Sequence, residues 1–276
     1  NNSLVLNSNR EAIADLTKFS EVMMICYDES TPIEQLRDVV NYQVPFNNAQ
    51  VNLLPVNPGI TSLKVDLCWA EGNKGKGIVV ANSDDGFWWK HPDVVKGVKQ
   101  NLGEDANHDG KTINIGTGTT SVFDPGDVNG VDDDGNGKID DLIGWDFTTN
   151  SYNITTASHG TATLSQVIGD GTMGTQTGVA PEAKCILMRN SSTQTQQWQT
   201  FQYAVLMGAD IITSSLSWKW PSRPDYSQFR IITDMSLAAG TVHTNSTSND
   251  ANSNGFPLNI STAGNCPAPW LHPEQL

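Results

Sequence analysis

Residues 77–86 read Gly-Ile-Val-Val-Ala-Asn-Ser-Asp-Asp-Gly, an apolar run that ends in two carboxylates and a glycine. The apolar part predicts a short buried strand over 77–81. Asp84 then stands at the carboxyl end of this strand. A carboxylate there can accept the Nδ1–H of a histidine, fix the tautomer of the ring and stabilise the imidazolium. Because turns also combine Asp with Gly, this run needs support from the rest of the chain.

Strands and helices are predicted to alternate on the carboxyl side of this run, joined by short connections that contain glycine. The apolar patterns predict strands over 184–189, 210–216 and 241–246, and helices over 160–169, 198–208 and 229–240. Such alternation predicts an α/β fold: a doubly wound, mostly parallel sheet with helices on both faces. Chemistry in such sheets gathers at the carboxyl ends of the strands.

Residues 157–162 read Ala-Ser-His-Gly-Thr-Ala and open the helix predicted over 160–169. A histidine followed by Gly-Thr at a helix start is typical of a catalytic base. The alternative for a single histidine is a purely structural role with satisfied hydrogen bonds. Asp84 upstream favours the catalytic interpretation, since the pair supplies a base and the group that orients it. The other four histidines lack such a context.

The composition limits the classes of partner. The 276 residues carry a formal charge of −14 and a pI of about 4.5. This balance argues against a nucleic-acid partner, which needs clustered Lys and Arg, and favours cation binding. No apolar run approaches the ~18–20 residues of a membrane span. Four cysteines allow three disulfide pairings, and the sequence leaves both the pairing and the oligomeric state open.

The acidic residues are concentrated between Asp124 and Asp146, where eight Asp accompany one Lys. Within this stretch Asp132, Asp134 and Asn136 alternate and a glycine stands sixth, which is the pattern of a calcium-binding loop. Position twelve is an isoleucine, so Asp140 or Asp141 would have to supply the late carboxylate. The alternative is a solvated acidic loop. We expect a structural Ca²⁺ here, because dense like charge is costly without a cation.

The same pattern occurs earlier in the chain. Residues 105–110 read Asp-Ala-Asn-His-Asp-Gly, with Asp105, Asn107 and Asp109 at the alternating positions. These three residues are candidate ligands of a second calcium ion.

Four motifs in order resemble the subtilisin-like serine peptidases, the subtilase family. They are the strand ending in Asp84 with His-Pro-Asp at 91–93, His-Gly-Thr at 159–161, Gly-Val-Ala-Pro at 178–181, and Gly-Ala-Asp at 208–210 with Ser-Leu-Ser at 215–217. The acidic run also resembles an insertion found between Asp and His in many bacterial subtilases. The resemblance covers roughly residues 61–276. It implies a three-layer sandwich, incomplete at the C-terminus.

The resemblance also implies roles for single residues. Asp84 would be the orienting carboxylate and His159 the general base. Asn249, near the end of the strand predicted over 241–246, would be the oxyanion-hole side chain. Residues Ser215, Leu216 and Ser217 would form the edge that pairs with a polypeptide substrate in extended conformation. Ser217 stands where the family has Gly, which would narrow this site.

The expected nucleophile motif is missing. In subtilases the serine lies in Gly-Thr-Ser, and all six Gly-Thr pairs of this chain are followed by another residue. We therefore expect a chain truncated before its nucleophile and inactive alone. The alternatives are a pseudo-protease that binds extended peptides without cutting them, and a calcium-dependent peptide-binding or structural module.

The chain is expected to divide near residue 60. Residues 1–60 are interpreted as an N-terminal extension or the remnant of a pro-segment, with an Asn- and Pro-rich linker at 47–60. Residues 61–276 would form the peptidase domain. Family resemblance and calcium loops together predict a secreted protein.

Overall fold

The computed structural model describes residues 10–16, 18–19, 22, 55–190, 193–216, 227–246 and 272–274. Its main element is a six-stranded sheet in which all neighbouring strands run parallel. The strands follow the order β4 (Gly144–Asp146), β5 (Lys184–Arg189), β1 (Val79–Asp84), β6 (Ile211–Ser214), β7 (Val242–Ser246) and β8 (His272–Glu274). The first strand of the sheet in the sequence, β1, is therefore central.

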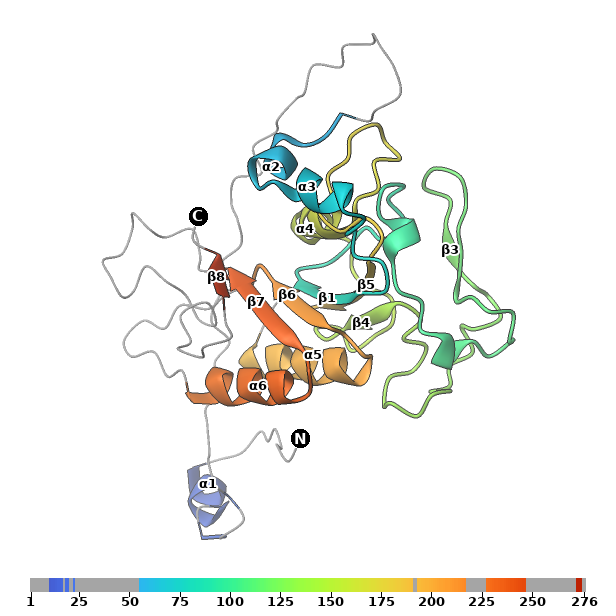
Figure 1. Cartoon of the computed structure of the whole chain (residues 1–276). Coiled ribbons are helices and arrows are strands. Elements are labelled where there is room, and N and C mark those ends of the chain that lie inside the picture. Colours follow the sequence, from blue (N-terminus) through green and yellow to red (C-terminus); the bar gives the residue numbers. More distant parts are fainter. Residues whose placement is uncertain are drawn as a thin grey trace.

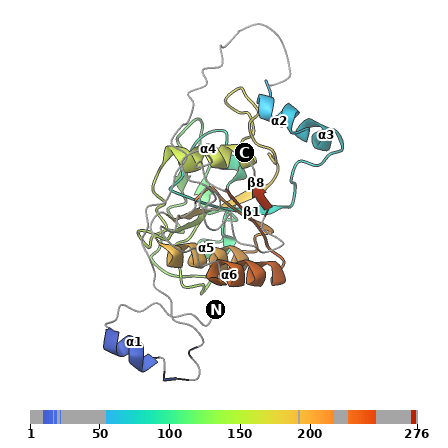
Figure 2. The ribbon, with the colours of Figure 1, turned by 90° about the vertical axis from the view of Figure 1, so that its left-hand side faces the viewer.

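Helices cover both faces of the sheet (Figures 1 and 2). Helix α4 (Ser158–Ile168) lies on one face, and α5 (Gln194–Leu206) and α6 (Ser227–Ala238) lie on the other. This arrangement confirms the doubly wound α/β fold. The remaining elements are α1 (Arg10–Leu16), α2 (Pro58–Ser62), α3 (Val65–Ala70), the 3₁₀ turns η1 (Val95–Gly97) and η2 (Leu102–Glu104), and the hairpin β2 (Ile113–Asn114) with β3 (Val122–Phe123).

Strand β5 shows why the sheet is covered twice. Cys185 and Leu187 belong to the core beneath α4, together with Leu164 and Ile168 of that helix. Ile186 and the residues of α5 form the opposite core. Successive side chains of a strand point to opposite faces, so an uninterrupted apolar run requires a layer on each side. The bounds of β5 agree with the strand predicted over 184–189.

Strand β1 differs from its predicted bounds. It runs from Val79 through Asp84 rather than ending at residue 81, because its polar residues are buried with partners. The Asn82 amide donates to Thr163 Oγ1 at 3.3 Å, and Ser83 Oγ donates to Gln197 Oε1 at 3.2 Å. Strands β4 and β8 were not predicted, since three residues are too few to show a periodic pattern.

The N-terminal predictions are mostly untested. Of residues 1–60 the structure describes α1, residues 18–19 and 22, and the segment from residue 55 onward. Residues 55–57 contact the main body, since Asn57 N–H donates to the Gln176 carbonyl and Gln176 N–H to that of Pro55. The division near residue 60 remains a prediction.

Within the described ranges, no helix has the length and hydropathy needed to cross a bilayer. Cys68 and Cys185 are free thiols, and the other two cysteines lie outside the described residues.

Candidate active site

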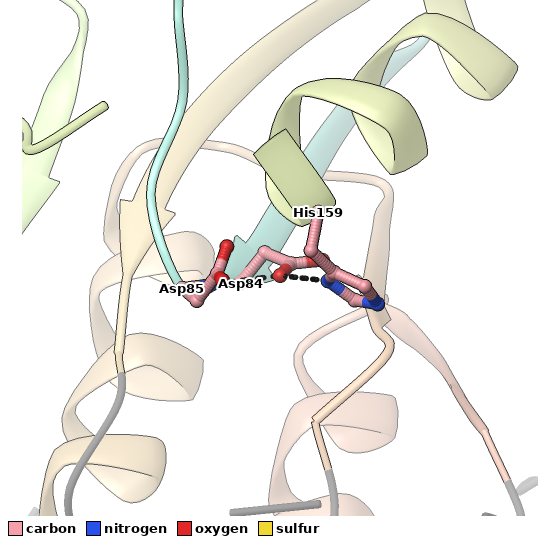
Figure 3. Close-up of side chains that lie close together, drawn as sticks. All are labelled: Asp84, Asp85 and His159. Atoms are coloured by element: carbon pink, nitrogen blue, oxygen red, sulfur yellow. Dashed lines mark hydrogen bonds and ion pairs between the residues drawn. The ribbon is translucent and has the colours of Figure 1, made fainter. Parts of the chain in front are cut away.

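The fold brings Asp84 and His159 together across 75 positions of sequence (Figure 3). Strand β1 ends at Asp84, and α4 begins one residue before His159. Nδ1 of His159 lies 2.6 Å from Oδ1 of Asp84. Since an ionised carboxylate only accepts, Nδ1 carries the proton of this hydrogen bond. The pairing expected from the sequence is therefore present as geometry.

The carboxylate of Asp84 is fully buried and held by three donors. Besides His159, the Asp85 N–H donates to Oδ1 at 2.7 Å, and Thr163 Oγ1 donates to Oδ2 at 2.8 Å. Thr163 in turn accepts the amide of Asn82. Donors on both oxygens fix the rotation of the carboxylate and keep Oδ1 facing the imidazole. Thr163 lies one turn of helix after His159, and nothing in the sequence pattern identifies it as a partner of Asp84.

His159 presents its other nitrogen without a partner. The residue is 6% exposed, and Nε2 is buried with no hydrogen-bond partner in the part of the chain that the structure describes. The hydrogen bond to Asp84 raises the pKa of His159; burial acts in the opposite direction, and the charges of Asp84 and Asp85 raise it further. A neutral imidazole with Nδ1–H fixed on a carboxylate offers a lone pair at Nε2, which is the requirement for a general base.

Gly160 and Thr161 explain why the histidine is followed by Gly-Thr. A Cβ added at Gly160 would lie 2.1 Å from the Gly86 carbonyl oxygen and 3.0 Å from Cβ of Asp84. Thr161 Oγ1 donates to the Ala157 carbonyl and accepts the Trp88 N–H at 2.8 Å. Glycine thus lets the helix start approach the end of β1, and threonine ties the start of α4 to the chain beyond Gly86.

We expect Gly160→Ala to destabilise the fold by roughly 1–3 kcal/mol, because overpacking displaces backbone. The Cβ would push α4 away from Gly86, which has a positive φ of 146° and can itself tolerate no side chain there. Urea unfolding measures the change. Ala162→Gly, two residues further along the same helix, is the control for helix propensity. Equal stability of Gly160→Ala and wild type would contradict the close approach.

Asp85 caps α4 from outside the helix. Its carboxylate accepts the Gly160 N–H at 3.0 Å, whereas the residue at the N-cap position, Ala157, has no side chain that could do so. Negative charge at a helix N-terminus is favourable. Desolvation raises the pKa of Asp85, and the charge of Asp84 adds to this, while the Gly160 N–H lowers it.

Arg189 fixes the loop that follows β1. Its Nη1 lies 3.1 Å from both carboxylate oxygens of Asp146, and its Nε donates to the Asp85 carbonyl at 2.9 Å. Burial of Asp146 raises its pKa, but the Thr149 N–H and the Arg189 guanidinium outweigh this effect and the net shift is downward. The sequence signalled neither residue, because each stands at the end of a strand, where charged residues are common.

The predicted substrate edge is described only in part. Ser215 and Leu216 follow the end of β6, Leu216 is buried, and its N–H donates to Ser214 Oγ at 3.2 Å. Ser217 and the oxyanion candidate Asn249 lie outside the described residues. Pairing with substrate and the oxyanion role therefore stay predictions.

The acidic loop at 132–137 folds around its own carboxylates. Asp132 accepts the N–H groups of Asn136 (3.0 Å) and Gly137 (2.8 Å), and Asp134 accepts that of Asn136 (2.9 Å). Among the described residues, Glu104 joins Asp132 and Asp134 in a group whose ligand oxygens all lie within 4.8 Å of one another. Glu104 was not singled out in the sequence, where it precedes the other loop and shows no spacing to this one.

The two candidates for a late carboxylate are placed differently. Asp141 accepts the Asn136 amide at 3.0 Å and the Tyr203 hydroxyl at 2.5 Å, so it lies beside the loop. Asp140 accepts the N–H groups of Asn129 and Gly130 instead. The structure therefore brings Glu104 and Asp141 to the loop, and turns Asp140 toward the preceding turn.

Burial makes two of these acids hard to ionise. Desolvation raises the pKa of Glu104 to about 7, and nearby Asp141 and Asp134 contribute, while N–H donors oppose the shift. Desolvation likewise raises the pKa of Asp141 to about 6, against hydrogen bonds from Tyr203, Asn136 and Asn101. Buried carboxylates of this kind favour a cation close by.

The comparison with known proteins agrees with this geometry. Residues 75–270 match the family model described as the subtilase family, Peptidase_S8. The chain belongs to the subtilase family. The match begins just before β1 and includes every strand of the sheet except β8, together with the three helices that cover it.

The chain is similar to a curated protein, the major intracellular serine protease of Bacillus subtilis (strain 168). The two are 31% identical over 173 residues, which are 60% of this chain and 41% of that protein. The chain thus spans less than half of this relative.

The chain is also similar to a number of solved structures. Fervidolysin from Fervidobacterium pennivorans, a keratinolytic enzyme related to subtilisin, has a TM-score of 0.43 at 17% identity over 67% of this chain and 23% of its own. MycP1 without its N-terminal propeptide has a TM-score of 0.44 at 16% identity over 68% of this chain and 47% of its own.

Proposed function

We propose that this chain carries the acid–base half of a serine endopeptidase. The observation behind the proposal is the buried Asp84–His159 pair, whose free Nε2 is available to take a proton from a nucleophile. In a Ser-His-Asp triad the histidine accepts the serine proton and later gives it to the leaving amine, while the aspartate holds the ring. Asp84 and His159 would have these roles, and membership of the subtilase family supports them.

The substrate would be a polypeptide bound in an extended conformation. Residues Ser215, Leu216 and Ser217 would offer main-chain hydrogen bonds beside the carboxyl end of β6. Asn249 would donate a hydrogen bond to the oxyanion. In subtilisin, the enzyme on which this effect was measured, such a donor contributes about 10²–10³ in kcat.

We also propose that the 276 residues alone do not cleave peptide bonds. None of their Gly-Thr pairs is followed by serine, and His159 without a nucleophile has nothing to activate. A serine-directed fluorophosphonate should leave this polypeptide unlabelled. The longest reading frame that contains it should be labelled at a Gly-Thr-Ser serine, and labelling should be lost in the His159→Ala variant of that longer protein.

The same experiment separates the competing functions. Stoichiometric labelling of the 276-residue chain would contradict the missing-nucleophile proposal. A reading frame without such a serine would instead favour a pseudo-protease, and binding of extended peptides without cleavage would then be measured directly.

Calcium is the proposed structural cofactor. The ligands would be Asp132, Asp134 and Asn136 with Glu104, and Asp141 beside them; Asp105, Asn107 and Asp109 would serve a second loop. Oxygen ligands at alternate positions and a glycine that permits the sharp turn suit this hard cation. Gly110 and Gly137 both have positive φ, at 86° and 88°.

We further propose that the protein acts outside the cell, where calcium sites of low affinity are filled. The curated relative is named an intracellular protease. Fractionation of the source cells, with the protein detected in the medium, tests this location.

A further inference from the structure

The two acidic loops have the same internal hydrogen bonds. In loop 132–137 the side chain of the first residue, Asp132, accepts the N–H groups of the fifth and sixth residues. The side chain of the third residue, Asp134, accepts the N–H of the fifth. In loop 105–110, Asp105 accepts the N–H groups of Asp109 (3.1 Å) and Gly110 (2.8 Å), and Asn107 accepts that of Asp109 (2.9 Å). In both loops the side chain of the fifth residue accepts the N–H of the seventh residue. The loops are therefore two copies of one local structure.

A carboxylate from outside each loop closes it at the same place. Glu104 accepts the N–H of the third residue of loop 132–137, Asp134, at 3.1 Å. Asp127 accepts the N–H of the third residue of loop 105–110, Asn107, at 3.3 Å. Glu104 belongs to the group of converging oxygens described above. Asp127 shares with Glu104 the contact to the N–H of the third loop residue. Counted from Asp105, the twelfth residue is Gly116, which cannot supply the late carboxylate of a calcium-binding loop.

Asp127 carries a buried oxygen that lacks a partner. The residue is fully buried, and its Oδ2 has no hydrogen-bond partner among the residues that the structure describes. Asp124, Asp105 and Asp109 act on it as neighbouring negative charges. The nearby Lys111 forms ion pairs with Asp109 (2.6 Å) and Asp124 (3.1 Å). A buried, unsatisfied carboxylate oxygen among like charges is costly unless a cation contacts it.

We propose that Asp127 closes a second, separate divalent-cation site on Asp105, Asn107 and Asp109. The ion is a hard cation that prefers oxygen, with Ca²⁺ as the expected occupant, because two loop carboxylates, an amide oxygen and a remote carboxylate match its ligands. This inference rests on the proposed calcium binding and adds to it the residue that completes the loop and the independence of the two sites.

Calorimetric titration of the chelator-treated chain with CaCl₂ tests the proposal. Wild type should bind two ions. Asp127→Asn should bind one ion with unchanged affinity and the other at least about tenfold more weakly, since ligand charge sets the affinity of such loops. Glu104→Gln should instead weaken binding of the ion in loop 132–137. Asp133→Asn removes one charge from an exposed residue of the same acidic surface and should change neither.

Lys111→Met should increase the affinity for calcium, a result that misfolding cannot produce. Its ammonium competes with an ion for Asp109, so its removal should tighten one of the two sites several-fold, and Asp127→Asn should abolish this gain. One ion in wild type, lost in Glu104→Gln and unaffected by Asp127→Asn, would overturn the second site and leave the first intact. No ion in wild type would overturn the calcium proposal as a whole.

Discussion

Asp84→Asn should lower the pKa of His159, because it removes an opposite charge that is in contact with the ring. Asp84 contributes the hydrogen bond at 2.6 Å that is the main cause of the raised pKa. An asparagine amide would also present a donor or a neutral acceptor to Nδ1, which removes the preference for one tautomer. Long-range ¹H–¹⁵N NMR of the histidine rings over a pH series measures both the pKa and the tautomer, and requires no nucleophile.

The stability of the protein should change with pH in the matching direction. A histidine whose pKa is raised in the folded state adds stability below its unfolded pKa of about 6.5, and this stability is lost as the pH rises through the folded value. Asp84→Asn should remove this dependence. Asp66→Asn, an exposed residue of α3, is a control of equal charge. An unchanged His159 titration in Asp84→Asn would mean that the two residues are not coupled in solution.

Removal of calcium should lower the melting temperature by roughly 5–10 °C. An ion present at 100 times its Kd stabilises the folded state by about 2.7 kcal/mol, and 1 kcal/mol corresponds to about 2–4 °C for a domain of this size. Without the ion, the oxygens of Glu104, Asp132 and Asp134 remain within 4.8 Å of one another, and their charges repel. Scanning calorimetry in CaCl₂ and in excess chelator gives the difference.

The variant Asp132→Asn/Asp134→Asn identifies the responsible loop. Its melting temperature should fall less on addition of chelator than that of wild type, because loop 132–137 has lost two charged ligands and its repulsion is relieved, while loop 105–110 is unchanged. Magnesium should not replace calcium, because it demands a nearly ideal octahedron and gives up its water reluctantly. Equal melting temperatures of wild type in calcium and in chelator would contradict a structural ion.

The sequence determined the fold class and the chemistry of the candidate pair, because both depend on local pattern. Apolar residues that continue without interruption from Cys185 to Met188 predict a strand buried on both faces, and the structure has β5 there. The helix expected from the spacing of Leu164 and Ile168 is α4. The histidine that precedes Gly-Thr and the aspartate that ends a strand are likewise recognised within a few residues.

Only the tertiary structure decided which side chains complete these sites. Thr163 meets Asp84 across 79 positions, and Glu104 meets the N–H of Asp134 across 30. Asp127 lies 20 positions from the loop that it closes. A lone threonine, glutamate or aspartate has no periodicity that marks its partner. Its role arises when packing of the sheet and its loops brings it, desolvated, beside a charge or a donor far away in the chain.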